Sequence, residues 1–60
     1  MNTSRQHLHK TRPAIGQRVR VFIFNFAGVE VIDGTYSEQA GRPLLDGVKL
    51  HPMRTEWVAA

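Results

Sequence analysis

A chain of 60 residues is long enough for one small domain, and a domain of this size buries only about 60% of its unfolded surface. The chain has no cysteine, which excludes disulfides and thiolate metal sites. Its formal charge of +3 belongs to residues 1–12, because residues 13–60 hold five basic and five acidic side chains. The neutral remainder therefore needs good packing, a ligand or a second copy to be stable.

The composition of residues 1–13 predicts a flexible basic arm. Apart from the first residue, this segment has one large aliphatic side chain and no regular apolar period. Pro13 discourages a helix from continuing into the next segment. Arg5, Lys10 and Arg12 could contact phosphates or an acidic protein surface. We expect that removing residues 1–12 leaves the fold nearly intact.

Residues 17–36 predict a β-hairpin. The run from Gln17 to Asn25 is rich in β-branched and aromatic residues, which suit a packed strand. Asn25-Phe26-Ala27-Gly28 is typical of a turn, and Gly28 can take the left-handed conformation that closes a three-residue loop. The returning strand then spans Val29 to Tyr36, and Asn25 lies opposite Val29.

This register predicts two faces of different character. The first is an ordinary core face, with Val19, Val21, Ile23, Val29 and Val31. The second carries the aromatic and basic side chains, namely Arg18, Arg20, Phe22, Phe24, Ile32 and Tyr36. A two-residue loop would change the pairs but would keep Phe22 and Phe24 opposite the core face.

The rest of the chain predicts loops and short strands. Ser37 to Pro43 has the composition of a loop. Leu44 to Leu50 is either a hairpin around Asp46-Gly47 or a single bulged strand. Thr55 to Val58 alternates as a closing strand, with Trp57 buried. We therefore expect an all-β domain over residues 14–60, built as a small antiparallel barrel or curled sheet of four to five strands.

Two resemblances bear on this fold. The segment Gly16-Gln17-Arg18-Val19-Arg20-Val21 resembles the first strand of SH3-like barrels, which implies a small SH3-like barrel. Residues 13–58 also resemble short phage and prophage proteins of unknown function. The shared positions are Pro13, Gly16, Val19, Val21 and Trp57. The chain lacks the early tryptophan and the terminal proline-rich segment of those proteins, and the resemblance implies a mobile-element origin without a known chemistry.

The sequence carries no catalytic motif. It has no G-x-S-x-G, no HExxH and no glycine-rich phosphate loop. His7, His9 and His51 could ligate a metal, but a mobile segment with no neighbouring carboxylate is a poor site. We expect a non-enzymatic protein without metal, cofactor or small-molecule substrate. No apolar run reaches the roughly 20 residues of a membrane span and no export signal is visible, so we expect a cytoplasmic protein.

The face with Phe22, Phe24, Ile32 and Tyr36 is the candidate functional surface. An apolar patch in so short a chain indicates self-association or a protein partner, such as a host protein of a phage accessory factor. In the alternative, the aromatic rings stack on bases while Arg18 and Arg20 bind phosphates with Arg5, Lys10 and Arg12. Burial of the face within the monomer also stays open. The neutral charge of residues 13–60 favours a protein partner or a second copy.

Overall fold

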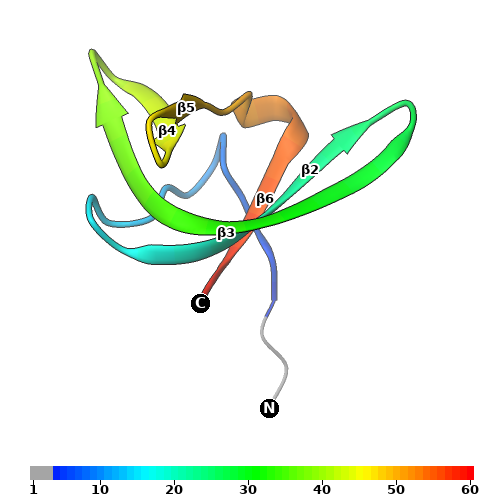
Figure 1. Ribbon diagram of the computed structural model, residues 1–60, viewed down its shortest axis with the longest axis horizontal. Coiled ribbons are helices and arrows are strands. Elements are labelled where there is room, and N and C mark those ends of the chain that lie inside the picture. Colours follow the sequence, from blue (N-terminus) through cyan, green and yellow to red (C-terminus); the bar gives the residue numbers. More distant parts are fainter. Residues whose placement is uncertain (1–3) are drawn as a thin grey trace.

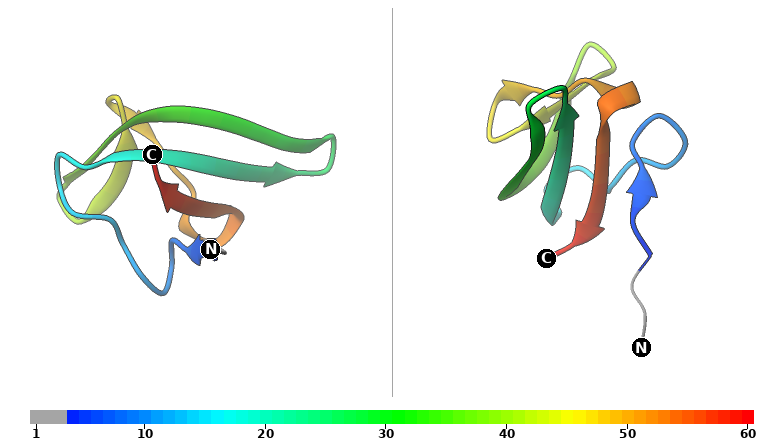
Figure 2. Two further views of the ribbon diagram at one scale, coloured as in Figure 1. Left: turned by 90° about the horizontal axis from the view of Figure 1, so that it is seen from below. Right: turned by 90° about the vertical axis from the view of Figure 1, so that its right-hand side faces the viewer.

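The computed structural model describes residues 4–60, which form one antiparallel sheet of six strands in the order β1-β6-β2-β3-β4-β5 (Figure 1). The elements are β1 (Gln6–His7), β2 (Arg18–Asn25), β3 (Gly28–Gln39), β4 (Arg42–Leu45), β5 (Val48–Lys49), the 3₁₀ turn η1 (Pro52–Arg54) and β6 (Thr55–Ala59). The sheet is strongly curled (Figure 2). The end strands β1 and β5 do not pair among the described residues, so the sheet is open and not closed into a barrel.

The first hairpin has a shorter loop than we predicted. Phe26 and Ala27 alone form the turn between β2 and β3, and Asn25 lies opposite Gly28. The side-chain Oδ1 of Asn25 accepts a hydrogen bond from the backbone N–H of Ala27 at 2.9 Å. Gly28 has a φ of 132°, which favours glycine at this position. The predicted three-residue loop is therefore wrong by one residue.

This difference moves every β3 side chain to the opposite face, because side chains alternate along a strand. Val31 lies opposite Phe22 and Val29 opposite Phe24, so both valines share the phenylalanine face. Ile32 lies opposite Val21, on the core side. The prediction that Val29 and Val31 belong to the core is wrong, whereas the separation of Phe22 and Phe24 from the core face is confirmed.

The core lies in the concave side of the curled sheet. Its buried apolar residues come from all six strands or their flanks, namely Leu8, Val19, Val21, Tyr36, Leu45, Leu50 and Trp57. Trp57 is buried on β6, as predicted for the closing strand. Its indole Nε1 donates a hydrogen bond to the carbonyl of Thr11 at 2.7 Å.

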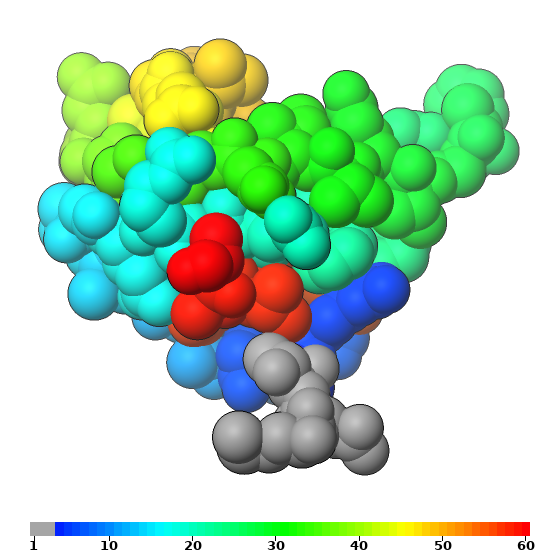
Figure 3. Space-filling model, turned by 60° about the horizontal axis from the view of Figure 1, so that its bottom comes forward, coloured from blue at the N-terminus to red at the C-terminus, as the bar shows by residue number. Residues whose placement is uncertain are grey.

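Residues 6–13 pack on the domain, so the predicted free arm is corrected for this part. β1 pairs with β6, with Gln6 opposite Trp57. Leu8 is fully buried and Pro13 is buried as well. In Figure 3 the N-terminal segment, coloured blue, lies directly against β6, coloured red. The part of the predicted arm that falls on residues 1–3 lies outside the described residues.

The second half of the chain forms tight hairpins. The predicted loop over residues 37–43 is instead the end of β3, a turn at Ala40-Gly41 and the start of β4. The turn at Asp46-Gly47 joins β4 and β5, which confirms the hairpin reading of residues 44–50. Within residues 4–60, no helix has the length and apolar character needed to cross a membrane.

Candidate interaction surface

The convex face of the sheet carries an apolar cluster on the hairpin between β2 and β3. Phe22 and Phe24 are half-buried, and their cross-strand neighbours Val31 and Val29 are 53% and 50% exposed. We call these four residues the outer patch. In Figure 3 the segments that form β3, β2 and β6 lie side by side, in the order that the strand pairing gives.

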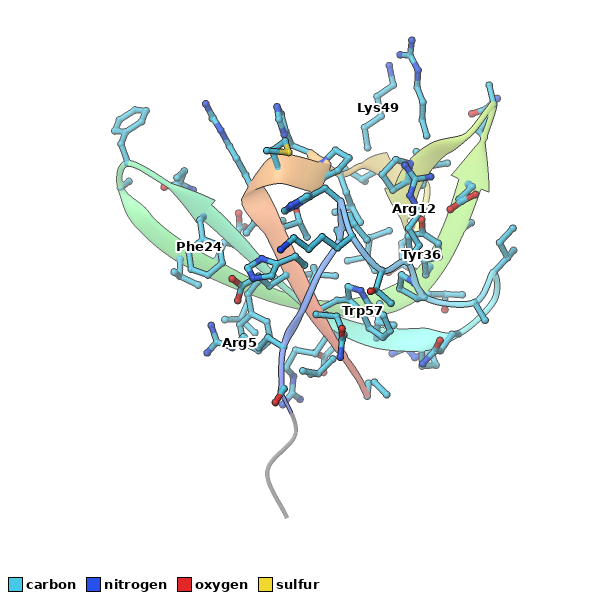
Figure 4. All side chains as sticks on the ribbon, turned by 180° about the vertical axis from the view of Figure 1, so that it is seen from behind. Arg5, Arg12, Phe24, Tyr36, Lys49 and Trp57 are labelled. Atoms are coloured by element: carbon cyan, nitrogen blue, oxygen red, sulfur yellow. The ribbon has the colours of Figure 1, made fainter. Side chains whose placement is uncertain are left out.

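Two of the four predicted face residues lie elsewhere. Tyr36 is fully buried in the core, and Figure 4 shows it near Trp57 and away from Phe24. Ile32 is 37% exposed on the concave side. Both corrections follow from the one-residue change of register, since even-numbered residues of β3 face the core. The predicted face is therefore reduced to Phe22 and Phe24, which Val29 and Val31 complete.

Arg5 covers one of the two phenylalanines. Its guanidinium carbon lies 3.9 Å from the centre of the Phe22 ring, which is a cation–π contact. The same guanidinium lies 3.8 Å from Glu56 on β6, and His7 Nδ1 lies 3.5 Å from the other oxygen of that carboxylate. Part of Phe22 is thus covered within the monomer by Arg5, a residue of the predicted flexible arm.

A second ion pair borders the outer patch. Arg20 donates hydrogen bonds of 2.7 and 3.0 Å to the two carboxylate oxygens of Asp33, its cross-strand neighbour. This hydrogen-bonded pair lowers the pKa of Asp33 and raises that of Arg20. Arg18, next along the face, donates to Thr35 Oγ1 at 3.3 Å. Both arginines are therefore oriented by β3.

The third ion pair lies at the other end of the sheet. Arg12 Nη1 donates to Glu38 Oε2 at 3.1 Å and to the carbonyl of Gly41 at 2.7 Å. The hydroxyl of Tyr36 donates to the same Glu38 oxygen at 2.6 Å. Burial, followed by this hydrogen bond, raises the pKa of Tyr36 to about 12, and the bonds from Tyr36 and Arg12 lower the pKa of Glu38.

The five predicted nucleic-acid contacts do not form one basic surface of free cations. Arg5, Arg12 and Arg20 each lie in an ion pair with a carboxylate. Lys10 is exposed in the turn after β1, and Arg18 binds Thr35. A cation that already neutralises a carboxylate contributes less to phosphate binding, since that pair must first be broken.

The described residues contain no metal-ligand cluster. The rings of His7 and His9 lie 5.6 Å apart, but no group of three or more histidine or acidic side chains among residues 4–60 could hold an ion. The concave side has a shallow apolar hollow of about 180 Å³, lined in part by Ile23, Ile32 and Val48. A second hollow of about 250 Å³ lies near Ala40 and Lys49.

Comparison with models of known protein families, with curated proteins and with solved structures finds no match to this chain. The resemblances to SH3-like barrels and to short phage proteins stay predictions.

The charge pair of Arg20 and Asp33 is the feature of the sequence that could have predicted the outer patch. A two-residue loop places Arg20 opposite Asp33, where opposite charges stabilise a strand pair. The three-residue loop places Val21 opposite Asp33, on the face that we assigned to the core. Charge complementarity therefore favours the observed register and, with it, Val29 and Val31 beside the phenylalanines.

Proposed function

We propose that the protein acts by binding another protein, without catalysis, and that the outer patch is its docking surface. The observation that carries this proposal is a partly exposed apolar cluster whose two bordering arginines, Arg5 and Arg20, are each paired with a carboxylate. Apolar clusters of this kind on small proteins commonly mark interaction sites. The SH3-like architecture belongs to the same proposal, supported by the curled sheet around Val19, Val21 and Trp57.

The paired charges favour protein over nucleic acid as the ligand. Arg5 and Arg20 border the outer patch, and each is matched by a carboxylate of the same chain. A neutral border suits an apolar protein surface, because little charge must be desolvated without a partner. Nucleic-acid binding would instead require excess positive charge along the face.

Peptide selection tests the proposal without a known partner. A random peptide library is selected on the wild-type protein, and the enriched peptides are measured against Phe24→Ala and Ile15→Ala. Ile15 is 71% exposed outside the sheet, so Ile15→Ala is a matched loss of exposed apolar surface. We expect Phe24→Ala to weaken binding by roughly tenfold or more, as for interface aromatic residues, and Ile15→Ala to leave it unchanged.

Equal effects of the two substitutions would contradict the outer patch as the docking surface. The nucleic-acid alternative is tested in parallel with single- and double-stranded oligonucleotides over a salt series. Oligonucleotide binding that weakens steeply with salt and is lost in Phe24→Ala would overturn the proposal in favour of that alternative.

A further inference from the structure

The first half of β3 has one open edge. β3 pairs with β2 from Gly28 to Thr35, but it pairs with β4 only from Tyr36 to Gln39. Among residues 4–60, no strand lies on the other side of its first half. In the left view of Figure 2 this part of β3 is the outermost strand of the long hairpin.

The hydrogen bonds at the end of the hairpin show which backbone groups face this edge. Tyr36 bonds toward β2, since its N–H donates to Gln17 O at 2.9 Å and its carbonyl accepts from Gly16 N at 2.8 Å. Thr35 bonds the other way, to Asp46, through its carbonyl at 3.0 Å and its N–H at 3.0 Å.

This direction alternates along an antiparallel strand. The pairing of β2 with β3 keeps a constant register from Arg18 to Asn25, so no bulge interrupts the alternation. Val29, Val31 and Asp33 therefore present their N–H and C=O groups on the open edge. Beyond Asp33 the edge is closed by Asp46.

We propose that an extended segment of a partner protein adds to this edge as a further strand, antiparallel to Val29–Asp33. An open edge with β-branched side chains is a template for strand addition. The inference rests on the proposed function and specifies the partner, because the added strand would extend the face that carries the outer patch.

The side chains around the edge define the chemistry of that segment. The residues opposite Val31 and Val29 lie on the convex face beside the outer patch, where apolar side chains fit. The residue opposite Glu30 lies on the concave side. Glu30 is exposed and has no ion pair within residues 4–60, so a lysine or arginine opposite it would be stabilised.

A second copy of the chain fits this edge poorly. In an antiparallel pair of two copies, a residue whose N–H and C=O groups face the open edge must lie opposite another such residue. This requirement allows only a few registers between the two copies. Pairing Val31 with Val31 puts the partner's Gly28 beside Gly34 and drives its turn into the place of Asp46. In the next register that this rule allows, Glu30 of one copy lies opposite Glu30 of the other. Like charges in this arrangement are destabilising. These conflicts favour a different protein as the occupant.

A designed peptide, acetyl-Thr-Ile-Val-Lys-Val-amide, tests the proposal with its lysine opposite Glu30. The control peptide has glutamate in place of lysine. We expect the lysine peptide to bind the wild-type protein roughly threefold to tenfold more tightly, and Glu30→Lys to reverse the preference. A preference that Glu30→Lys leaves unchanged would overturn the proposal.

N-methylation of the peptide tests the backbone pairing without altering the protein. Methylation at the central valine blocks an N–H that faces β3 and should abolish binding. Methylation at the lysine blocks an N–H that faces away and should leave binding unchanged. Equal effects at both positions would contradict strand addition.

The remaining outcomes separate this inference from the proposed function. One outcome is that the selected peptides need Phe24 for binding but bind equally well when a residue facing β3 or a residue facing away from it is N-methylated. This outcome would support the outer patch as the docking surface and would overturn the pairing at the edge of β3. Wild-type dimers in light scattering that become monomers in Val31→Pro, which lacks the edge-facing N–H, would identify a second copy as the occupant and overturn the proposal.

Discussion

Tyr36 shows how a single residue helps to join the N-terminal segment to β3. Its ring is fully buried in the core, while its hydroxyl reaches Glu38, which also binds Arg12. The N-terminal segment and β3 are thereby joined through one carboxylate. The sequence predicted Tyr36 on an exposed face because only the register of the hairpin decides whether an even-numbered residue of β3 faces the core.

The titration of Tyr36 tests whether its hydroxyl is buried and hydrogen-bonded. Since burial raises its pKa to about 12, the neutral phenol is favoured in the folded state. This contribution to the free energy of unfolding is complete below the ordinary tyrosine pKa of about 10 and is lost as the pH rises toward about 12. Tyr36 is the single tyrosine of the chain, so phenolate absorbance measures its titration directly.

Tyr36→Phe is the matched variant for this test. It should lose the pH dependence of stability in that window and, because one hydrogen bond is removed, unfold with a free energy lower by about 1 kcal/mol near neutral pH. A wild-type phenolate titration with a midpoint near 10 would contradict the buried, hydrogen-bonded Tyr36.

Among the elements, β1 and its following turn contribute most to the core beyond what was predicted. Leu8 fills the space beside β6, and the indole of Trp57 binds the carbonyl of Thr11. A single aliphatic residue among polar neighbours gives no periodic signal, which is why the sequence predicted a free arm. The hairpin of β2 and β3, the turn at Asp46-Gly47 and the closing strand β6 could be predicted from alternation, turn residues and Trp57. The pairing of the end of β3 with the start of β4 could not, because residues 37–43 have the composition of a loop.

Leu8→Ala should therefore destabilise the fold by about 2–5 kcal/mol, the usual cost of a large-to-small change in a core. Removal of residues 1–12 should unfold the chain, contrary to the expectation from the sequence. Ile15→Ala is the control, since Ile15 is largely exposed and should change the free energy of unfolding little. Chemical denaturation followed by Trp57 fluorescence measures all three. An unchanged midpoint in Leu8→Ala would mean that β1 does not support the core.

The turn between β3 and β4 contains a residue in an unfavourable conformation. Ala40 has a φ of 53°, followed by Gly41 at 77°. Asparagine tolerates positive φ better than alanine in such two-residue turns. Ala40→Asn should raise the thermal midpoint, with a gain of roughly 0.5–1 kcal/mol. Ala27→Asn, in a turn where φ is not positive, should give no such gain. Equal shifts in the two variants would argue against the described turn.

At the scale of the whole molecule, charge and apolar surface are arranged separately. Three arginines are paired with carboxylates, while Val29 and Val31 leave apolar surface on the convex face. The sequence predicted the neutral balance and half of the apolar cluster. The other half, Val29 and Val31, was not predicted, because its face depends on the register of the hairpin. Two loop lengths fit the turn residues equally, and only the pairing of Arg20 with Asp33 distinguishes them.

Chemical-shift mapping by NMR tests the docking surface most directly. Isotope-labelled protein is titrated with the tightest peptide from the selection, and the amide shifts are followed residue by residue. We predict that the largest shifts occur at Phe22, Phe24, Val29 and Val31, with small shifts around Arg42 and Arg54. Shifts concentrated on the basic residues or in the concave hollow, with the outer patch unchanged, would contradict the proposed function.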